Sequence, residues 1–206
     1  MFSQELKRDV LFKLSELLVP FEKLVALLQR PECELTTDHF VDLLSKIQDG
    51  DVLFSETFYE LSNGIKIGDK YYLGIPGSWK HVAIYQDGMV YEAVTKGVRR
   101  ISLPEWFFKK DSVGIARCNQ FALTPMHDTV GAEFLQSCLG AEYQFNFASY
   151  TKGKYYCSAY WYSYMEAMYG DAFLEWFPMP MMFGVLPIIQ PQDVWNKLDK
   201  VASYNE

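Results

Sequence analysis

The chain has 206 residues, of which 50% are hydrophobic and 22% are charged. This composition excludes a disordered or fibrous protein, and the length is sufficient for a domain with its own buried core. The formal net charge of −7 argues against a nucleic-acid partner, because non-specific binding of nucleic acid needs a basic surface. The 15 Phe, 14 Tyr and 5 Trp indicate either a heavily packed core, which we favour, or an apolar groove or membrane-facing surface.

The N-terminal part of the chain is predicted to be helical. Apolar side chains recur every three or four residues over 4–30, and Pro20 interrupts this run. Thr36 or Thr37 is expected to cap a second helix that ends near Gly50. We therefore divide the chain into an N-terminal helical extension, residues 1–48, and a main domain, residues 49–206.

The sequence predicts neither a signal peptide nor a transmembrane segment. Charged side chains interrupt the apolar residues near the N-terminus, unlike the core of a signal peptide. No apolar run approaches the roughly 20 residues that a spanning helix needs. We expect a cytoplasmic protein with reduced thiols, while peripheral contact with a membrane stays open.

The main domain is expected to be α+β. Strands are predicted over 51–54, 81–85, 89–94, 97–101 and 112–117, and helices over 127–138 and from Cys157 to Gly170. Between the second and third strands, Asp87-Gly88 is a strong signal for a two-residue hairpin turn. Residues 55–79 are rich in Gly and are expected to form a long loop or hairpin.

The predicted hairpin brings an imidazole and a carboxylate together. A two-residue turn at Asp87-Gly88 places Ala83 opposite Glu92. Because side chains alternate between the faces of a strand, His81 and Glu92 then share one face and lie diagonal to each other. A carboxylate there would orient the ring and favour the imidazolium.

Cys157 is a candidate nucleophile at the start of a predicted helix. A thiol there feels the positive end of the helix dipole. With an imidazolium beside it, the thiol pKa can fall from about 8.5 to roughly 3.5–7.5, which makes the thiolate available at neutral pH. A single Cys in an aromatic-rich helix is more often a buried apolar residue, so the prediction depends on the combination with His81 and Glu92.

The other candidate groups are given structural roles. His39 and His127 are expected to be structural or surface residues. The four Cys show no zinc-ligand spacing, so no metal site is predicted. Lys96, Arg99 and Arg100 are expected to form a solvated surface cluster, with contact to a substrate carboxylate or phosphate as the alternative.

Several segments together resemble a known family. These segments are GDVLFSE, KHVAIYQDGMVYEAVTKGVRRISLPEWF, LGAEYQFNF, YYCSAYWYSY and LPIIQPQDVW. In order and spacing they are similar to the circularly permuted papain-like amidases, the YiiX-like group of the NlpC superfamily. The resemblance covers roughly residues 49–195. It implies an antiparallel sheet or small barrel packed against helices, and it makes the main domain the catalytic domain.

The resemblance implies a cysteine hydrolase that cleaves an amide bond through a thioester and needs no cofactor. By analogy Cys157 is the nucleophile, His81 the general base and then acid, and Glu92 the orienter of His81. Tyr143 is implied near the oxyanion site, with Tyr155 and Tyr156 as alternatives. Ala159 stands where many members carry Glu, which bears on substrate choice.

Three functional readings stay open at this point. A peptide or amide substrate is the first choice. A lipid-directed acyltransferase or esterase is the second, because lecithin–retinol acyltransferase resembles the same arrangement and the apolar residues of 173–183 could line an acyl groove. Core packing is the other interpretation of that stretch, and we favour it slightly. The third reading is an inactive binding module of the same fold.

Overall fold

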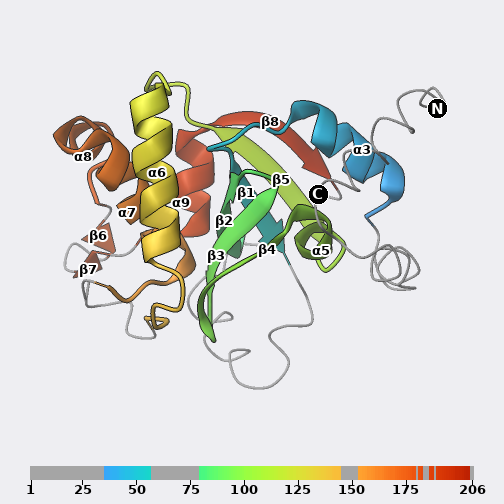
Figure 1. Ribbon diagram of the computed structural model, residues 1–206, viewed down its shortest axis with the longest axis horizontal. Coiled ribbons are helices and arrows are strands. Elements are labelled where there is room, and N and C mark those ends of the chain that lie inside the picture. Colours follow the sequence, from blue (N-terminus) through green and yellow to red (C-terminus); the bar gives the residue numbers. More distant parts are fainter. Residues whose placement is uncertain are drawn as a thin grey trace.

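The computed structural model describes residues 35–56, 79–144, 153–179, 181–182, 186–187 and 189–204. The predicted helix over 4–30 and most of the predicted loop over 55–79 lie outside the described residues. Within them the fold is α+β, as predicted: a six-stranded antiparallel sheet lies between two groups of helices (Figure 1).

The sheet is open, with the strand order β4-β3-β2-β1-β5-β8, and all neighbouring strands are antiparallel. This order decides between the sheet and the small barrel that the sequence left as alternatives. The five predicted strands are confirmed, and β8, which follows the Pro-rich tail, was not predicted. The strands are β1 (Val52–Glu56), β2 (His81–Gln86), β3 (Met89–Val94), β4 (Gly97–Ser102), β5 (Ser112–Arg117) and β8 (Asp199–Tyr204).

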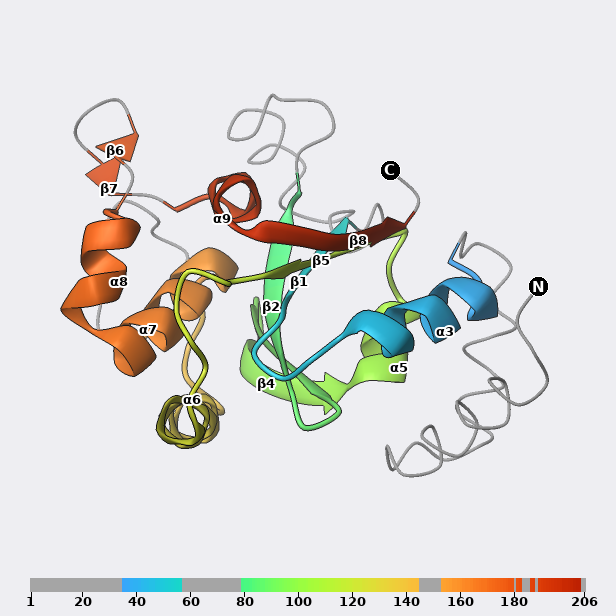
Figure 2. The same cartoon turned by 90° about the horizontal axis from the view of Figure 1, so that it is seen from above.

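Helices cover both faces of the sheet (Figure 2). One face carries α6 (Pro125–Ser137), α7 (Cys157–Tyr169), α8 (Asp171–Trp176) and α9 (Pro191–Lys197), and the other carries α3 (Thr37–Lys46) and α5 (Leu103–Phe107). A short two-stranded sheet, β6 (Met181–Met182) and β7 (Leu186–Pro187), lies near α8. The helices predicted over 127–138 and 157–170 are confirmed as α6 and α7.

The two faces of the sheet bury separate hydrophobic clusters. Along β1, Val52 and Phe54 point into the cluster under α7, whereas Leu53 points into the cluster under α3 and α5. All three side chains are fully buried. This central strand is therefore apolar at successive positions because both of its faces are covered.

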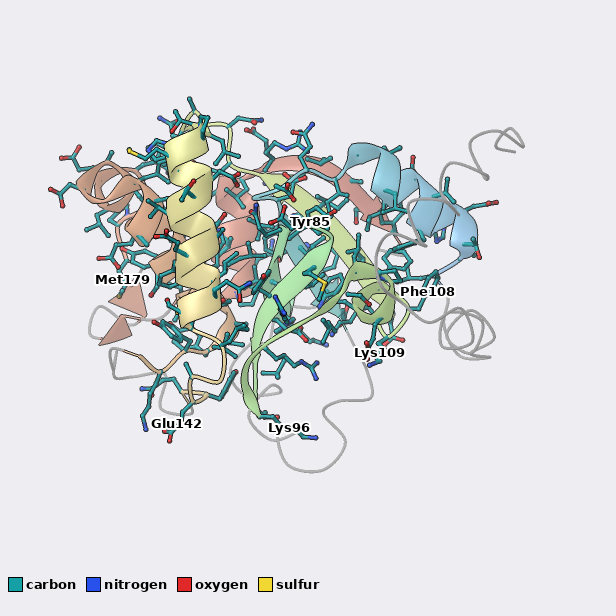
Figure 3. The ribbon with its side chains drawn as sticks, viewed as in Figure 1. Tyr85, Lys96, Phe108, Lys109, Glu142 and Met179 are labelled. Carbon is teal, nitrogen blue, oxygen red and sulfur yellow. The ribbon has the colours of Figure 1, made fainter. Side chains whose placement is uncertain are left out.

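Helix α3 is held by its cap and by aromatic contacts. Its N-cap is Thr36, one of the two candidates from the sequence: the hydroxyl accepts a hydrogen bond of 3.2 Å from the backbone N–H of His39. Phe40 packs on the rings of Phe107 and Phe108, each with its centroid 5.1 Å away, and Figure 3 shows Phe108 between α5 and α3. Helix α3 thus covers the sheet, and the proposed division of the chain at residue 48 stays a prediction.

Candidate active site

The β2–β3 hairpin forms with the predicted register. Asp87 and Gly88 form the turn with positive φ angles of 50° and 73°, the left-handed conformation that a two-residue hairpin turn requires. Ile84 pairs with Tyr91, which continues to the predicted pairing of Ala83 with Glu92. The His81 Nε2 and a Glu92 carboxylate oxygen, Oε2, lie 2.8 Å apart. The predicted contact between imidazole and carboxylate is therefore present.

Glu92 is fully buried and accepts hydrogen bonds on both oxygens. Arg99, its partner on β4, donates from Nε and Nη2 to Oε1 over 2.9 and 2.6 Å. Trp106 on α5 donates from Nε1 to Oε2 over 3.0 Å. Oε2 therefore accepts hydrogen bonds from both His81 and Trp106, and Oε1 accepts only from Arg99 among these groups.

Cys157 is the first residue of α7, and 8% of it is exposed. Its sulfur hydrogen-bonds the His81 side chain and accepts from the backbone N–H of Val82. The Ser158 hydroxyl lies 3.7 Å from the sulfur. Because His81 Nε2 faces Glu92, Nδ1 is the ring nitrogen that remains for the thiol. The structure therefore joins sulfur, imidazole and carboxylate in one chain of hydrogen bonds.

The electrostatic environment favours the charged form of all three groups. Burial raises the pKa of Cys157, but the hydrogen bond and charge of His81 outweigh it, and the net pKa is lowered. Burial lowers the pKa of His81, but Cys157 and Glu92 outweigh it and raise that pKa from 6.5 to about 9. Burial likewise raises the pKa of Glu92, and contacts with His81 and with nearby cations hold it well below its usual range. The site therefore shifts all three groups toward a thiolate, an imidazolium and a carboxylate.

Tyr143 lies beside the segment that leads into α7. Its backbone forms an isolated bridge with Tyr155, two residues before Cys157. The hydroxyls of the two alternatives have structural contacts: Tyr155 accepts from the Cys138 thiol over 3.5 Å, and Tyr156 accepts from the Ile189 backbone N–H over 3.1 Å. The role of Tyr143 at the oxyanion site stays a prediction, as do the alternatives Tyr155 and Tyr156.

The expectation of a solvated cluster holds for Lys96 and Arg100 but only in part for Arg99, which is half exposed and also binds Glu92. Arg100 and Lys96 are exposed, and Figure 3 shows Lys96 at the tip of the β3–β4 hairpin, but Arg99 turns to the buried Glu92. The hairpin arithmetic that paired Ala83 with Glu92 would also have paired Glu92 with Arg99 across the turn at residues 95–96. Trp106 carried no comparable signal, because its contact depends on how α5 packs on the sheet.

His39 and His127 lie at the starts of helices and have structural contacts, in agreement with the prediction of structural or surface residues. The ring of His39 accepts from the backbone N–H of Thr36, and the Thr124 hydroxyl caps the helix that contains His127. Among the described residues no group of three or more His, Cys, Asp or Glu side chains could hold a metal ion. Glu92 does not suit a metal either, since N–H donors already occupy both of its oxygens.

Two described members of the apolar stretch near residue 175, Phe173 and Phe177, belong to the core. Phe173 and Phe177 are buried and stack against each other with centroids 6.0 Å apart. Both pack edge-on against Trp161 of α7. Core packing therefore explains Phe173 and Phe177, and these two side chains do not support an acyl groove.

An α+β fold with a cysteine at a helix start, facing a histidine on an antiparallel sheet, defines the papain-like class of cysteine enzymes. A family model described as "Permuted papain-like amidase enzyme, YaeF/YiiX, C92 family" matches residues 46–172. The chain belongs to this family.

The fold is also similar to a solved structure, the yiiX protein of Escherichia coli O157:H7, with a TM-score of 0.56 and 19% sequence identity. The match covers 77% of this chain and 98% of that one. That protein is described as a metalloprotein. A comparison with curated proteins finds no match.

Proposed function

We propose that this protein is a cysteine-dependent hydrolase that cleaves an amide bond in a peptide or an acylated amine through a thioester intermediate. The observation that carries the proposal is the hydrogen-bonded chain from Cys157 through His81 to Glu92. Each link is buried or partly buried, where electrostatic interactions are stronger than in water. Membership of a papain-like amidase family supports the same reaction class.

In the proposed reaction, the Cys157 thiolate attacks the amide carbonyl and forms a C–S bond. The carbonyl electrons move to oxygen, and the resulting oxyanion lies at the N-terminus of α7, where backbone N–H groups lack helical partners. The Cys157 N–H and the Tyr143 hydroxyl are the proposed donors. His81 then gives its proton to the leaving amine as the C–N bond breaks, which leaves a thioester and a neutral imidazole.

Water completes the proposed cycle. Neutral His81 accepts a proton from the attacking water, the C–S bond breaks, and a carboxylic acid leaves. The recovered thiolate and imidazolium restore the starting state. Glu92 keeps the ring oriented in both halves of the cycle, because Nε2 stays bonded to it while Nδ1 exchanges the proton.

The peptide or amide substrate remains our first choice. The lipid-directed alternative was based on the apolar stretch that includes Phe173 and Phe177, and these side chains are used in the core. The inactive-module alternative does not explain why a buried thiol, imidazole and carboxylate lie in one hydrogen-bonded line. No helix in the described part of the chain combines the length and apolarity that crossing a bilayer would require.

The test is selective modification of Cys157 followed by turnover assays. Iodoacetamide at pH 6, with peptide mass spectrometry, should label Cys157 well before Cys118, whose pKa burial raises. Cys157→Ala and His81→Ala should each abolish hydrolysis of an acyl-amide library while leaving the circular dichroism spectrum unchanged, and Cys118→Ala is the matched control. Equal labelling of both cysteines at pH 6, or full turnover by Cys157→Ala, would remove the nucleophile assignment.

A further inference from the structure

Building on the proposed function, we infer that Arg99 is a positioning residue for this site, which acts on His81 and Cys157 through Glu92. Two N–H groups of its guanidinium converge on Oε1 of Glu92, over 2.9 and 2.6 Å. His81 contacts Oε2, the other oxygen of the same carboxylate, over 2.8 Å. Arg99 thus lies one carboxylate away from the imidazole and does not touch the thiol.

The first effect of Arg99 is geometric. The terminal torsion of a Glu side chain has broad minima, so a carboxylate held at one oxygen can still turn. Arg99 holds Oε1, and Trp106 donates to Oε2 from the side of α5. With both oxygens held, Oε2 presents one direction to His81, and the ring is fixed with Nδ1 toward the sulfur.

The second effect is electrostatic. Four groups face Glu92: His81 from β2, Arg99 from β4, Trp106 from α5, and Lys110 from the residues after α5. Arg99 offsets part of the carboxylate charge, together with Lys110. Glu92 can therefore orient the imidazolium without binding its proton too tightly for transfer to a leaving group.

Lys110 and Trp106 support the same arrangement. The Lys110 ammonium is buried and lies over the Trp106 ring, 5.3 Å from the centroid. A cation over the ring face withdraws electron density and makes the indole N–H a stronger donor. The donors around Glu92 are therefore a connected set, and Arg99 is the member that faces solvent on its outer side, with 38% of its side chain exposed.

The experiment compares Arg99→Gln, Arg99→Lys and Arg100→Gln in the full chain. Arg100 is the matched control, since it is the adjacent arginine on β4 and is exposed. The readout is the rate of Cys157 alkylation by iodoacetamide as a function of pH, which needs no substrate. Thermal unfolding of each variant establishes that the fold is retained.

Removing the Arg99 charge leaves more of the Glu92 charge acting on His81 and Cys157, which disfavours the thiolate. We expect the alkylation midpoint of Arg99→Gln to rise by about half a pH unit or more, after allowing for solvent screening. Arg100→Gln should leave the midpoint unchanged. A folded Arg99→Gln protein with the wild-type midpoint would overturn the electrostatic role.

Arg99→Lys tests the geometric role, because it keeps the charge and removes the two-point contact. We expect the midpoint to stay near that of the wild type. In the proton NMR spectrum, the downfield resonance of the hydrogen-bonded His81 Nε2–H should weaken by exchange. An unchanged resonance in Arg99→Lys would overturn the geometric role. This test does not depend on Arg99→Gln being folded.

The two proposals fail in different ways. A wild-type midpoint near the ordinary thiol pKa of about 8.5 would remove the proposed hydrolase function itself. A low wild-type midpoint, together with Arg99 variants that leave both the midpoint and the resonance unmoved, would remove only the role of Arg99.

Discussion

Replacing Glu92 by Gln tests the carboxylate end of the hydrogen-bonded chain that runs from Cys157 through His81 to Glu92. The carboxylate accepts from four N–H groups, two on each oxygen. A glutamine amide has one acceptor and one NH2, so its NH2 must face either Arg99 or Trp106, both of which only donate. Turned toward His81, the NH2 requires an unprotonated Nε2, which moves the ring proton to Nδ1 and blocks its action as a base toward the sulfur.

The cost of this change has two parts. Removing one partner of a buried ion pair costs about 3–5 kcal/mol, and this is reduced because 38% of the Arg99 side chain is exposed. A donor left facing a donor costs about 1–3 kcal/mol, part of which overlaps with the first figure. We therefore expect a loss of about 2–4 kcal/mol in the free energy of unfolding, or a fall in Tm of about 5–15 °C for a chain of this size.

The assay combines calorimetry with turnover of an acyl-amide substrate found in the library screen. Activity should fall about 100-fold, less than on removal of Cys157, because Glu92 orients the base and does not react. Glu105→Gln is the matched control, since Glu105 pairs with Lys109 in a more exposed ion pair at 2.9 Å and should change Tm little. A Glu92→Gln protein with wild-type Tm and activity would refute the reasoning.

Two further predictions concern stability. In its ion-pair form the native Cys157–His81 pair holds one proton, on His81, and between about pH 6.5 and 9 the unfolded pair also holds one, on the thiol. The raised pKa of His81 stabilises the fold at low pH, and this stabilisation is lost as the pH rises to about 9. The lowered pKa of Cys157 has the opposite effect, because it adds stability as the pH rises over the same range. The unfolding free energy of the wild type in urea should therefore be flat across this window, and a steady decline would contradict the ion pair. Gly97→Ala should lose about 1–3 kcal/mol in urea unfolding, because φ is +107° and a Cβ would lie 2.7 Å from the Ala141 carbonyl oxygen. Gly153→Ala, with φ +84° and open space, should lose only about 1 kcal/mol, and equal losses at the two sites would show that the clash is absent.

Local rules were sufficient for much of the site. The register of the β2–β3 hairpin depends on two turn residues, and it places His81 against Glu92 without reference to the rest of the molecule. The start of α7 at Cys157 was likewise readable from sequence, and Gly170 ends the helix as expected. The same arithmetic applied to the next hairpin would have found Arg99 as the partner of Glu92.

Contacts between distant elements were not readable in this way. Trp106 reaches Glu92 only because α5 packs against the face of the sheet that carries this carboxylate. The strand β8 pairs with β5 across more than 80 residues of sequence, and no local pattern in the Pro-rich tail predicts this strand or its pairing. The sequence also could not establish that Phe173 and Phe177 belong to the core, because an apolar run has the same composition in a core and in a groove.

The sequence by itself determined the α+β class, the hairpin that pairs an imidazole with a carboxylate, and the helix that begins with a thiol. Each of these depends on neighbours within a few residues, where turn geometry and strand alternation act directly. The tertiary structure decided that the sulfur meets the imidazole and that Trp106 of α5 joins Arg99 in holding the carboxylate. Those contacts depend on how the sheet and helices pack around a shared core, a property of the whole chain that no short segment carries.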